Sequence, residues 1–198
     1  EFHHSPLLNA AASEIFRRSE SFMDGLEFRS RSELQDRAFA LVSLGWAYAF
    51  LACSPTDLSE HLQMSLREIG RETDLRMAEI AFSSMTLDHA SARPLALAKV
   101  GLTHPYFAVD RPGTVVVVKP AGWEVDGPQT EVGEQGLLSD FMREHFPRRK
   151  FPLTHMRDFQ FGFIHRLDIP SSGLILAGTT FEGLYSLRLQ INQLTMRR

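Results

Sequence analysis

The residues best suited to chemistry lie in the run HRLDIPSSG, at positions 165–173, which leads into an apolar stretch. Its carboxylate, Asp168, could attack an electrophilic carbon or remove a proton. Arg166 could pair with Asp168 and keep it ionised, or it could contact a phosphate. The Ser-Ser-Gly after it favours a tight turn that presents Asp168 at the rim of a sheet. On composition alone, an ordinary salt bridge between Asp168 and Arg166 is the simpler interpretation.

A second informative run, VVVVKPAG at positions 115–122, lies upstream of the first. Four β-branched residues in a row, bounded by Pro112-Gly113 and Pro120, predict a buried strand. Lys119 stands in the Lys-Pro-Ala-Gly turn behind that strand. It could support a binding groove, or it could be a solvated lysine before a structural turn.

Together these two runs resemble the signature of RluA-type pseudouridine synthases. In that signature an apolar strand ending in Lys-Pro-Ala/Pro-Gly precedes a His-Arg-Leu-Asp run and a second apolar strand. The resemblance covers roughly residues 101–198. It implies an isomerase of the intramolecular transferase kind, which converts uridine to pseudouridine in RNA on a base removed from the stack. It further implies Asp168 as the nucleophile or base, His165 as a positioning group, and a reaction without cofactor or metal.

The RNA partner that this resemblance implies, whether rRNA, tRNA or mRNA, would meet basic residues. The candidate RNA contacts are His165, Arg166, Arg148, Arg149, Lys150 and Lys119. Residues 148–150, together with Arg157, form a basic cluster of the kind that contacts phosphates, although such a cluster is as often only a solvated loop. Arg166 could also fill the gap left by a flipped base.

Several positions depart from the pattern of the family. Pro170 and Thr179 stand where polar or acidic residues and lysine, respectively, are common. The later motifs of the family, a tyrosine that stacks on the flipped uracil and an Ile-Arg strand, have no counterpart in residues 177–198. Tyr185 comes too early and falls on a predicted helix. We therefore expect a fragment of a longer gene product, or a truncated gene model, that is inactive by itself.

Other enzyme classes fit the sequence less well. The HRLD run looks loosely like a kinase catalytic loop, but no Asp-Phe-Gly follows it and no glycine-rich phosphate loop precedes it. A serine hydrolase would need a Gly-x-Ser-x-Gly elbow, which the sequence lacks. The eight histidines show no metal-ligand spacing apart from His3-His4. The serious alternative is a helical-repeat RNA-binding or scaffold protein that carries an inactive synthase remnant.

The elements predicted around these runs mix strands with helices, which indicates an α+β fold with a mixed, mainly antiparallel sheet. Besides the valine strand, we expect strands at 161–164 and 174–177. Helices are expected at 136–146 and at 181 to about 194. A polar loop should connect Gly127 to Gly136.

Residues 1–100 are predicted to form a helical region, separate from a synthase segment at 101–198 and joined to it through roughly 86–105. A capping box at Ser32 and Gln35 would begin a helix that continues through the apolar run Ala38–Cys53, buried on nearly all sides.

Further helices should follow in the same region. Ser54-Pro55 is a helix start, and Thr73 should cap the next helix, which Arg93-Pro94 would end. The first of these two helices has an apolar stripe made of Leu58, Leu62, Leu66 and Ile69. The inner face of the second would hold Leu75, Ala78, Phe82 and Met85.

The stretch AFALVSLGWAYA, at positions 38–49, resembles a helix of organellar RNA-binding repeats of the octotricopeptide kind. That resemblance would point to RNA binding by residues 1–100 and to a mitochondrion or plastid. A generic helical core explains the same Ala, Leu and Trp pattern.

Composition and charge bear on three further questions: which half of the chain meets RNA, the cellular compartment, and a membrane partner. The 198 residues carry a net charge of -3, but residues 101–198 hold 11 Lys/Arg against 10 Asp/Glu, whereas residues 1–100 hold 10 against 14. RNA should therefore meet the second half more readily. Cys53 is the only cysteine, which favours a reducing, intracellular compartment. The longest apolar run falls short of the roughly 20 residues that span a bilayer, so no membrane partner is expected. The oligomeric state is left open.

Overall fold

The computed structural model of the chain describes Ala10, Glu14 and the ranges 30–50, 56–83, 103–127 and 136–193. Its contacts divide the chain into two compact units, Glu1–Leu66 with Leu189–Arg198, and Arg67–Arg188. The predicted helix start at Ser54-Pro55, the predicted end at Arg93-Pro94 and most of the predicted linker lie outside the described residues.

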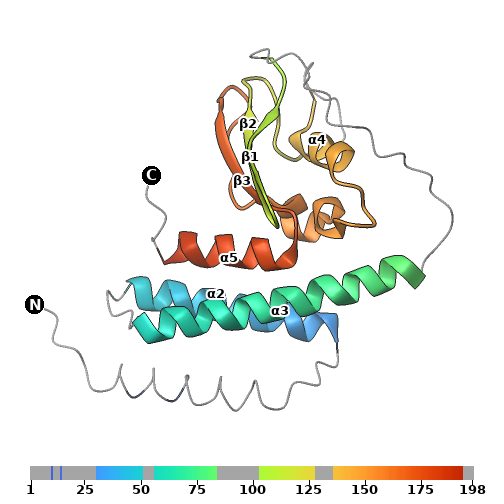
Figure 1. Cartoon of the computed structure of the whole chain (residues 1–198). Helices are drawn as coiled ribbons and strands as arrows, with labels where there is room; N and C mark the ends of the chain where they lie inside the picture. The colour runs from blue at the N-terminus through green and yellow to red at the C-terminus, as the bar shows by residue number, and fades with distance from the viewer. Residues whose placement is uncertain are drawn as a thin grey trace, which may run out of the picture. The chain divides into compact units, whose positions relative to one another are not determined.

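The first unit contains helix α2 (Arg31–Phe50), which begins with a capping box (Figure 1). The Glu33 amide donates to Ser30 Oγ at 3.3 Å, and the Ser30 amide donates to Glu33 Oε2 at 3.0 Å. These reciprocal bonds satisfy two amides at the helix start. The box predicted at Ser32 and Gln35 is therefore wrong by two residues.

Only one face of α2 is covered. Its buried residues recur every three or four positions, as an amphipathic helix requires, and are Leu34, Ala38, Val42, Gly45 and Tyr48. On other sides Phe39 is 73% exposed and Trp46 is 53% exposed. The prediction of a helix buried on nearly all sides is wrong, because apolar residues occupy more of the helix than its neighbours cover.

Helix α3 (Thr56–Ser83) runs without a break through the position where a new helix was predicted. The predicted apolar stripe is confirmed, with Leu58, Leu62, Leu66 and Ile69 each at most 3% exposed. Thr73 is not a cap: it lies inside α3, and its hydroxyl donates to the Ile69 carbonyl at 2.7 Å. The predicted second inner face is also wrong, because Leu75 is 56% exposed and Ala78 is exposed.

The second unit is built on a three-stranded antiparallel sheet in the order β1-β2-β3 (Figure 1). The predicted strands at 115–118 and 174–177 are confirmed as β2 (Thr114–Lys119) and β3 (Gly173–Gly178). Strand β1 (Tyr106–Arg111) was not predicted. With its helices, the sheet gives the predicted α+β fold.

The core of this unit lies between one face of the sheet and α4 (Leu138–His145), which confirms the helix predicted at 136–146. The buried side chains that form it include Val115, Val117, Leu138, Met142, Phe146, Phe163 and Ile175. The predicted strand at 161–164 is wrong. Two 3-10 helices, η1 (Pro152–His155) and η2 (Arg157–Gly162), occupy this region, and only Phe163 makes a bridge, to Ala177.

The opposite face of the sheet is apolar and partly open to solvent. Strand alternation and register place Tyr106, Val118 and Leu174 in one row across the three strands, and Val109, Val116 and Leu176 in the next. Tyr106 and Val109 are each 41% exposed, and Leu174 is 59% exposed.

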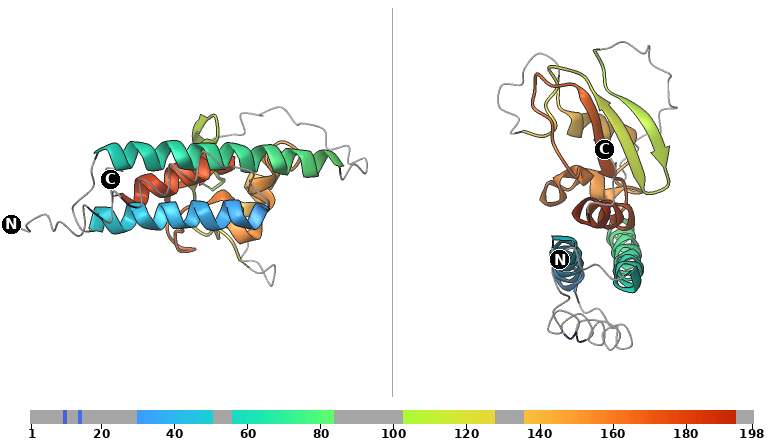
Figure 2. Two further views of the ribbon diagram at one scale, coloured as in Figure 1. Left: turned by 90° about the horizontal axis from the view of Figure 1, so that it is seen from below. Right: turned by 90° about the vertical axis from the view of Figure 1, so that its left-hand side faces the viewer.

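Helix α5 (Phe181–Asn192) follows β3 directly and confirms the last predicted helix. It begins at the end of the sheet, beside the second half of α3 (Figure 2). Within the described ranges, no helix is long and apolar enough to cross a membrane.

Candidate active site

Asp168 lies in the loop that leads into β3. Two bonds fix the start of this loop along β3: the Ile164 amide donates to the Leu176 carbonyl at 3.2 Å, and the Leu176 amide donates to His165 Nε2 at 3.1 Å. The Ser171 amide donates to the Asp168 carbonyl at 3.0 Å, which closes a tight turn. The Asp168 side chain is exposed. The loop therefore offers a carboxylate to solvent from a hydrogen-bonded backbone.

The Lys-Pro-Ala-Gly turn after β2 packs against this loop. Lys119 pairs with Gly173 at the end of the sheet, and the Gly122 amide donates to the Ile169 carbonyl at 2.7 Å. Gly122 has a φ of 86°, a left-handed conformation that favours glycine. The two sequence runs that carry the resemblance therefore meet in space.

Lys119 joins them most directly. Its side chain is 0% exposed, and its ammonium donates to the carbonyls of Pro120 at 3.2 Å, Ile169 at 3.2 Å and Ser171 at 2.5 Å. Burial lowers the pKa of Lys119, and the negative charge of Asp168 opposes that shift. The ammonium therefore fixes two residues of the Asp168 turn, Ile169 and Ser171, while it interacts electrostatically with the Asp168 carboxylate.

Arg166 contacts the chain on the other side of the loop. Its guanidinium donates to the Asp126 carbonyl at 2.9 Å, and no ion pair between described residues includes Asp168. The simple Arg166–Asp168 salt bridge is thus not formed, and the carboxylate is left open to a substrate. Leu167, between them, packs against the core.

The basic cluster lies on different segments. Arg148, Arg149 and Lys150 occupy the exposed turn after α4, and Arg157 is exposed at the start of η2. Lys150 Nζ lies 5.2 Å from the centroid of the Phe151 ring.

His155, on η1, lies close enough to this region to interact with its charges. Burial lowers its pKa, a hydrogen bond with the Phe146 carbonyl opposes the shift, and the charges of Arg148 and Arg143 lower the pKa further. The turn after α4 itself holds three exposed basic residues, the residue types that contact phosphates.

Two functional contacts were missed by sequence reasoning. The burial of Lys119 had a signal, because Lys119 continues the inward alternation of Val115 and Val117 in β2. The Asp126 carbonyl, which accepts a hydrogen bond from Arg166, had no such signal, because a backbone carbonyl is present in every residue. Among the described residues, no group of three or more His, Cys, Asp or Glu side chains could hold a metal ion.

Comparison with known proteins gives a match to a family model. Searches of curated proteins and of solved structures found none. Residues 113–198, which contain the Lys119 turn and the Asp168 loop, match the family model of RNA pseudouridylate synthase. This match covers less than half of the chain and makes this part similar to the pseudouridine synthase superfamily.

Proposed function

We propose that the chain belongs to an RluA-type RNA pseudouridine synthase in which Asp168 is the catalytic residue. The observation that carries the proposal is the hydrogen-bonded turn at the end of the sheet. There, Lys119 and Gly122 hold the backbone beside an exposed carboxylate, inside the segment that matches the synthase family. The RluA subtype rests on the resemblance of the two runs.

The reaction breaks the bond between N1 of uracil and C1′ of the ribose. The base then turns, and a bond forms between its C5 and C1′, while the proton of C5 is lost and N1 gains one. No atom is added or removed overall, so a single ionised carboxylate suffices as nucleophile at the sugar or base, or as the base that accepts a proton. Asp168 can play this part because it is exposed and takes part in no ion pair among the described residues.

The remaining predicted site residues support the reaction in two ways. His165 and Lys119 position the loop, through Leu176 on one side and through Ile169 and Ser171 on the other. The cluster at 148–150, with Arg157, contacts RNA phosphates. Arg166, at the rim of the loop, contacts the RNA near the flipped base.

The test compares Asp168→Asn with Asp158→Asn in the full-length protein. Asparagine keeps the shape of aspartate but can act neither as nucleophile nor as base. Release of tritium from RNA labelled at C5 of uridine should be abolished in Asp168→Asn, while its RNA binding and circular dichroism stay unchanged. Asp158 is an exposed aspartate of η2 in the same unit, and its variant should keep full activity.

Two outcomes would count against the proposal. Tritium release by Asp168→Asn would show that another group performs the chemistry. A wild-type protein that binds RNA but releases no tritium from any RNA pool would favour the alternative, a helical RNA-binding or scaffold protein with an inactive synthase remnant.

A further inference from the structure

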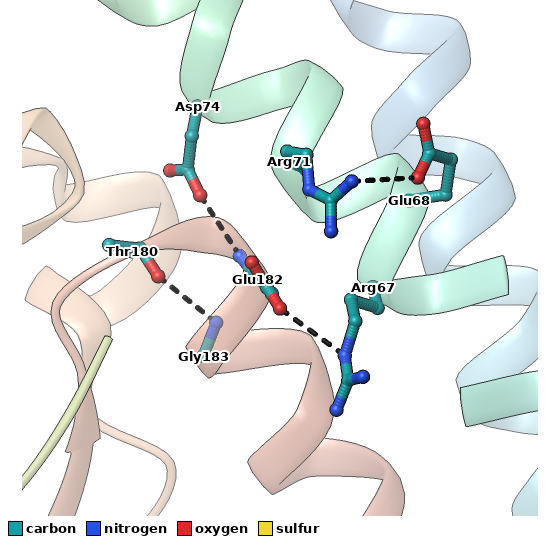
Figure 3. A network of polar contacts seen from close by, with 7 residues as sticks. All are labelled: Arg67, Glu68, Arg71, Asp74, Thr180, Glu182 and Gly183. Carbon is teal, nitrogen blue, oxygen red and sulfur yellow. Dashed lines mark hydrogen bonds and ion pairs between the residues drawn. The ribbon is translucent and has the colours of Figure 1, made fainter. Parts of the chain in front are cut away.

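The first amides of α5 are satisfied by a residue that lies far away in the sequence. The amides of Phe181 and Glu182 donate to the two carboxylate oxygens of Asp74, on α3, at 2.8 and 3.2 Å. Figure 3 shows the bond from Glu182. The next amide, of Gly183, donates to the Thr180 hydroxyl at 3.1 Å. The first amides of a helix have no partner within the helix, and a carboxylate there also interacts favourably with the helix dipole. Asp74 therefore caps a helix to which it does not belong.

The contact between α3 and α5 is made at backbone distance. A Cβ atom on Gly70 would lie 2.4 Å from Cα of Glu182, so no side chain larger than hydrogen fits there without a shift. One turn earlier, Arg67 Nε lies 3.3 Å from Glu182 Oε1. Arg67, Gly70 and Asp74 are spaced three and four residues apart and therefore share one face of α3. We call this face the α3 brace.

The charges of the brace show which contact matters most. Arg67 and Glu182 are 57% and 40% exposed, so their ion pair contributes little. Asp74 is half-buried, and burial raises its pKa, against the two backbone hydrogen bonds, which lower it, while the charge of Glu182 adds to the rise. A carboxylate that is partly removed from water needs its hydrogen-bond partners, and here those partners are two amides of α5.

We infer that the α3 brace is an integral part of the synthase fold in this chain, which therefore starts within α3 and not at residue 113, where the family match begins. The contact clusters agree, because they place Arg67–Arg188 in one compact unit. The brace holds α5, α5 follows β3, and β3 starts at the turn that presents Asp168. The inference concerns folding and does not depend on the proposed activity.

Hydrogen exchange of the full-length protein, resolved to single amides, tests the brace. In Asp74→Ala, exchange at Phe181 and Glu182 should accelerate about five- to tenfold, the effect of losing a helix cap. Exchange at Gly183 should change less, because Thr180 still caps it. Glu79→Ala, at an exposed site of the same helix, is the control and should leave all three amides unchanged.

Two further variants test separately the two acceptor oxygens of Asp74 and the close approach of the helices at Gly70. Asp74→Asn keeps one acceptor oxygen, so one of the two amides should stay protected. Gly70→Ala should give the same loss of protection as Asp74→Ala, because it separates the helices. If Asp74→Ala fails to fold while Glu79→Ala folds, the brace is likewise confirmed as part of the fold. Unchanged exchange at Phe181 and Glu182 in a folded Asp74→Ala protein would overturn the inference.

Discussion

Lys119 shows what a single residue contributes to this site. Lysine side chains are seldom fully buried unless they are paired. Lys119 is 0% exposed, with three backbone carbonyls around its ammonium. Its role is therefore to hold the turn next to Asp168, and an RNA contact would require it to leave those carbonyls. The RNA contact predicted for Lys119 remains a prediction, and the burial of its side chain favours support of the groove over a solvated lysine.

Replacing Lys119 by methionine measures that role. Methionine keeps most of the volume but removes the donor, so the carbonyls of Pro120, Ile169 and Ser171 lose a partner. The free energy of unfolding should fall by about 1–3 kcal/mol. Chemical denaturation of the wild type and the variant is the measurement. Lys150→Met, at an exposed lysine, should change the stability by no more than about 0.5 kcal/mol. Equal effects of the two substitutions would show that the buried ammonium contributes nothing special.

At the residue scale, the sequence singled out the Asp168 loop but did not reveal how this loop is held. Asp168 stands in a run whose residue types carry the chemistry, so the carboxylate could be singled out. The partner expected for it, Arg166, instead donates to the Asp126 carbonyl. Sequence neighbours need not be spatial partners in a loop, because successive side chains point in different directions. The catalytic role of Asp168 and the RNA contacts remain predictions.

At the scale of elements, strong patterns were predicted well and weak ones were not. The valine run of β2 and the apolar start of β3 specify strands through β-branched and aliphatic residues. Strand β1, YFAVDR, is mostly exposed and has a bulge between Phe107 and Val109, so its alternation is broken. The apolar residues at 161–164 suggested a strand, but Gln160 and Phe161 adopt positive φ values of 54° and 53°, which end any extended pairing there.

Helix ends gave the other errors. Thr73 has the residue type of a cap, but its hydroxyl can also bond the carbonyl four residues earlier, and α3 therefore continues through it. In α2 two serines compete for the cap. The pair Ser30 and Glu33 forms the box, since it allows both side chains to reach back to amides. Sequence alone gives both serines a glutamate or glutamine three residues later and cannot rank them.

The capping box of α2 can be tested by comparison of two serines. Ser30→Ala removes the acceptor of the Glu33 amide, and the free energy of unfolding should fall by about 1 kcal/mol. Ser43→Ala, at an exposed position inside the same helix, should leave stability unchanged or slightly raised, because alanine is the better helix former. Thermal unfolding followed by circular dichroism is sufficient. A loss confined to Ser43→Ala would contradict the assignment of the cap.

At the scale of the whole molecule, the charge distribution predicts which surface would bind RNA. The overall charge is -3, so binding must come from local basic surface rather than from net attraction. The turn at 148–150 is the candidate, because its three basic residues are exposed. The separation of the two halves near residue 100 remains a prediction, and limited proteolysis distinguishes it from the boundary within α3 inferred above.

Charge reversal tests whether the turn at 148–150 contacts RNA. Arg148→Glu with Arg149→Glu should weaken binding of every RNA alike. It should also reduce the slope of log affinity against log salt by about 1.4, if each arginine contacts one phosphate of a single strand. Fluorescence anisotropy at several salt concentrations measures both. Arg37→Glu with Arg71→Glu changes the net charge equally on α2 and α3 and should alter the affinity much less. Unchanged binding and an unchanged salt slope in the variant with Arg148→Glu and Arg149→Glu would show that this turn does not contact RNA.

The four valines of β2 have a consequence for the fidelity of strand pairing. Because they are apolar toward both the core and the open face, a slip of β2 by one residue would exchange valine for valine at most positions. Hydrophobic alternation therefore cannot select the native register. Selection must come from the ends of the strand: Gly113, with a φ of 80° in the hairpin turn, and Lys119, which reaches the carbonyls of Ile169 and Ser171 only in the native alignment. Lys119, which holds the Asp168 turn, therefore also selects the register of β2 in the sheet.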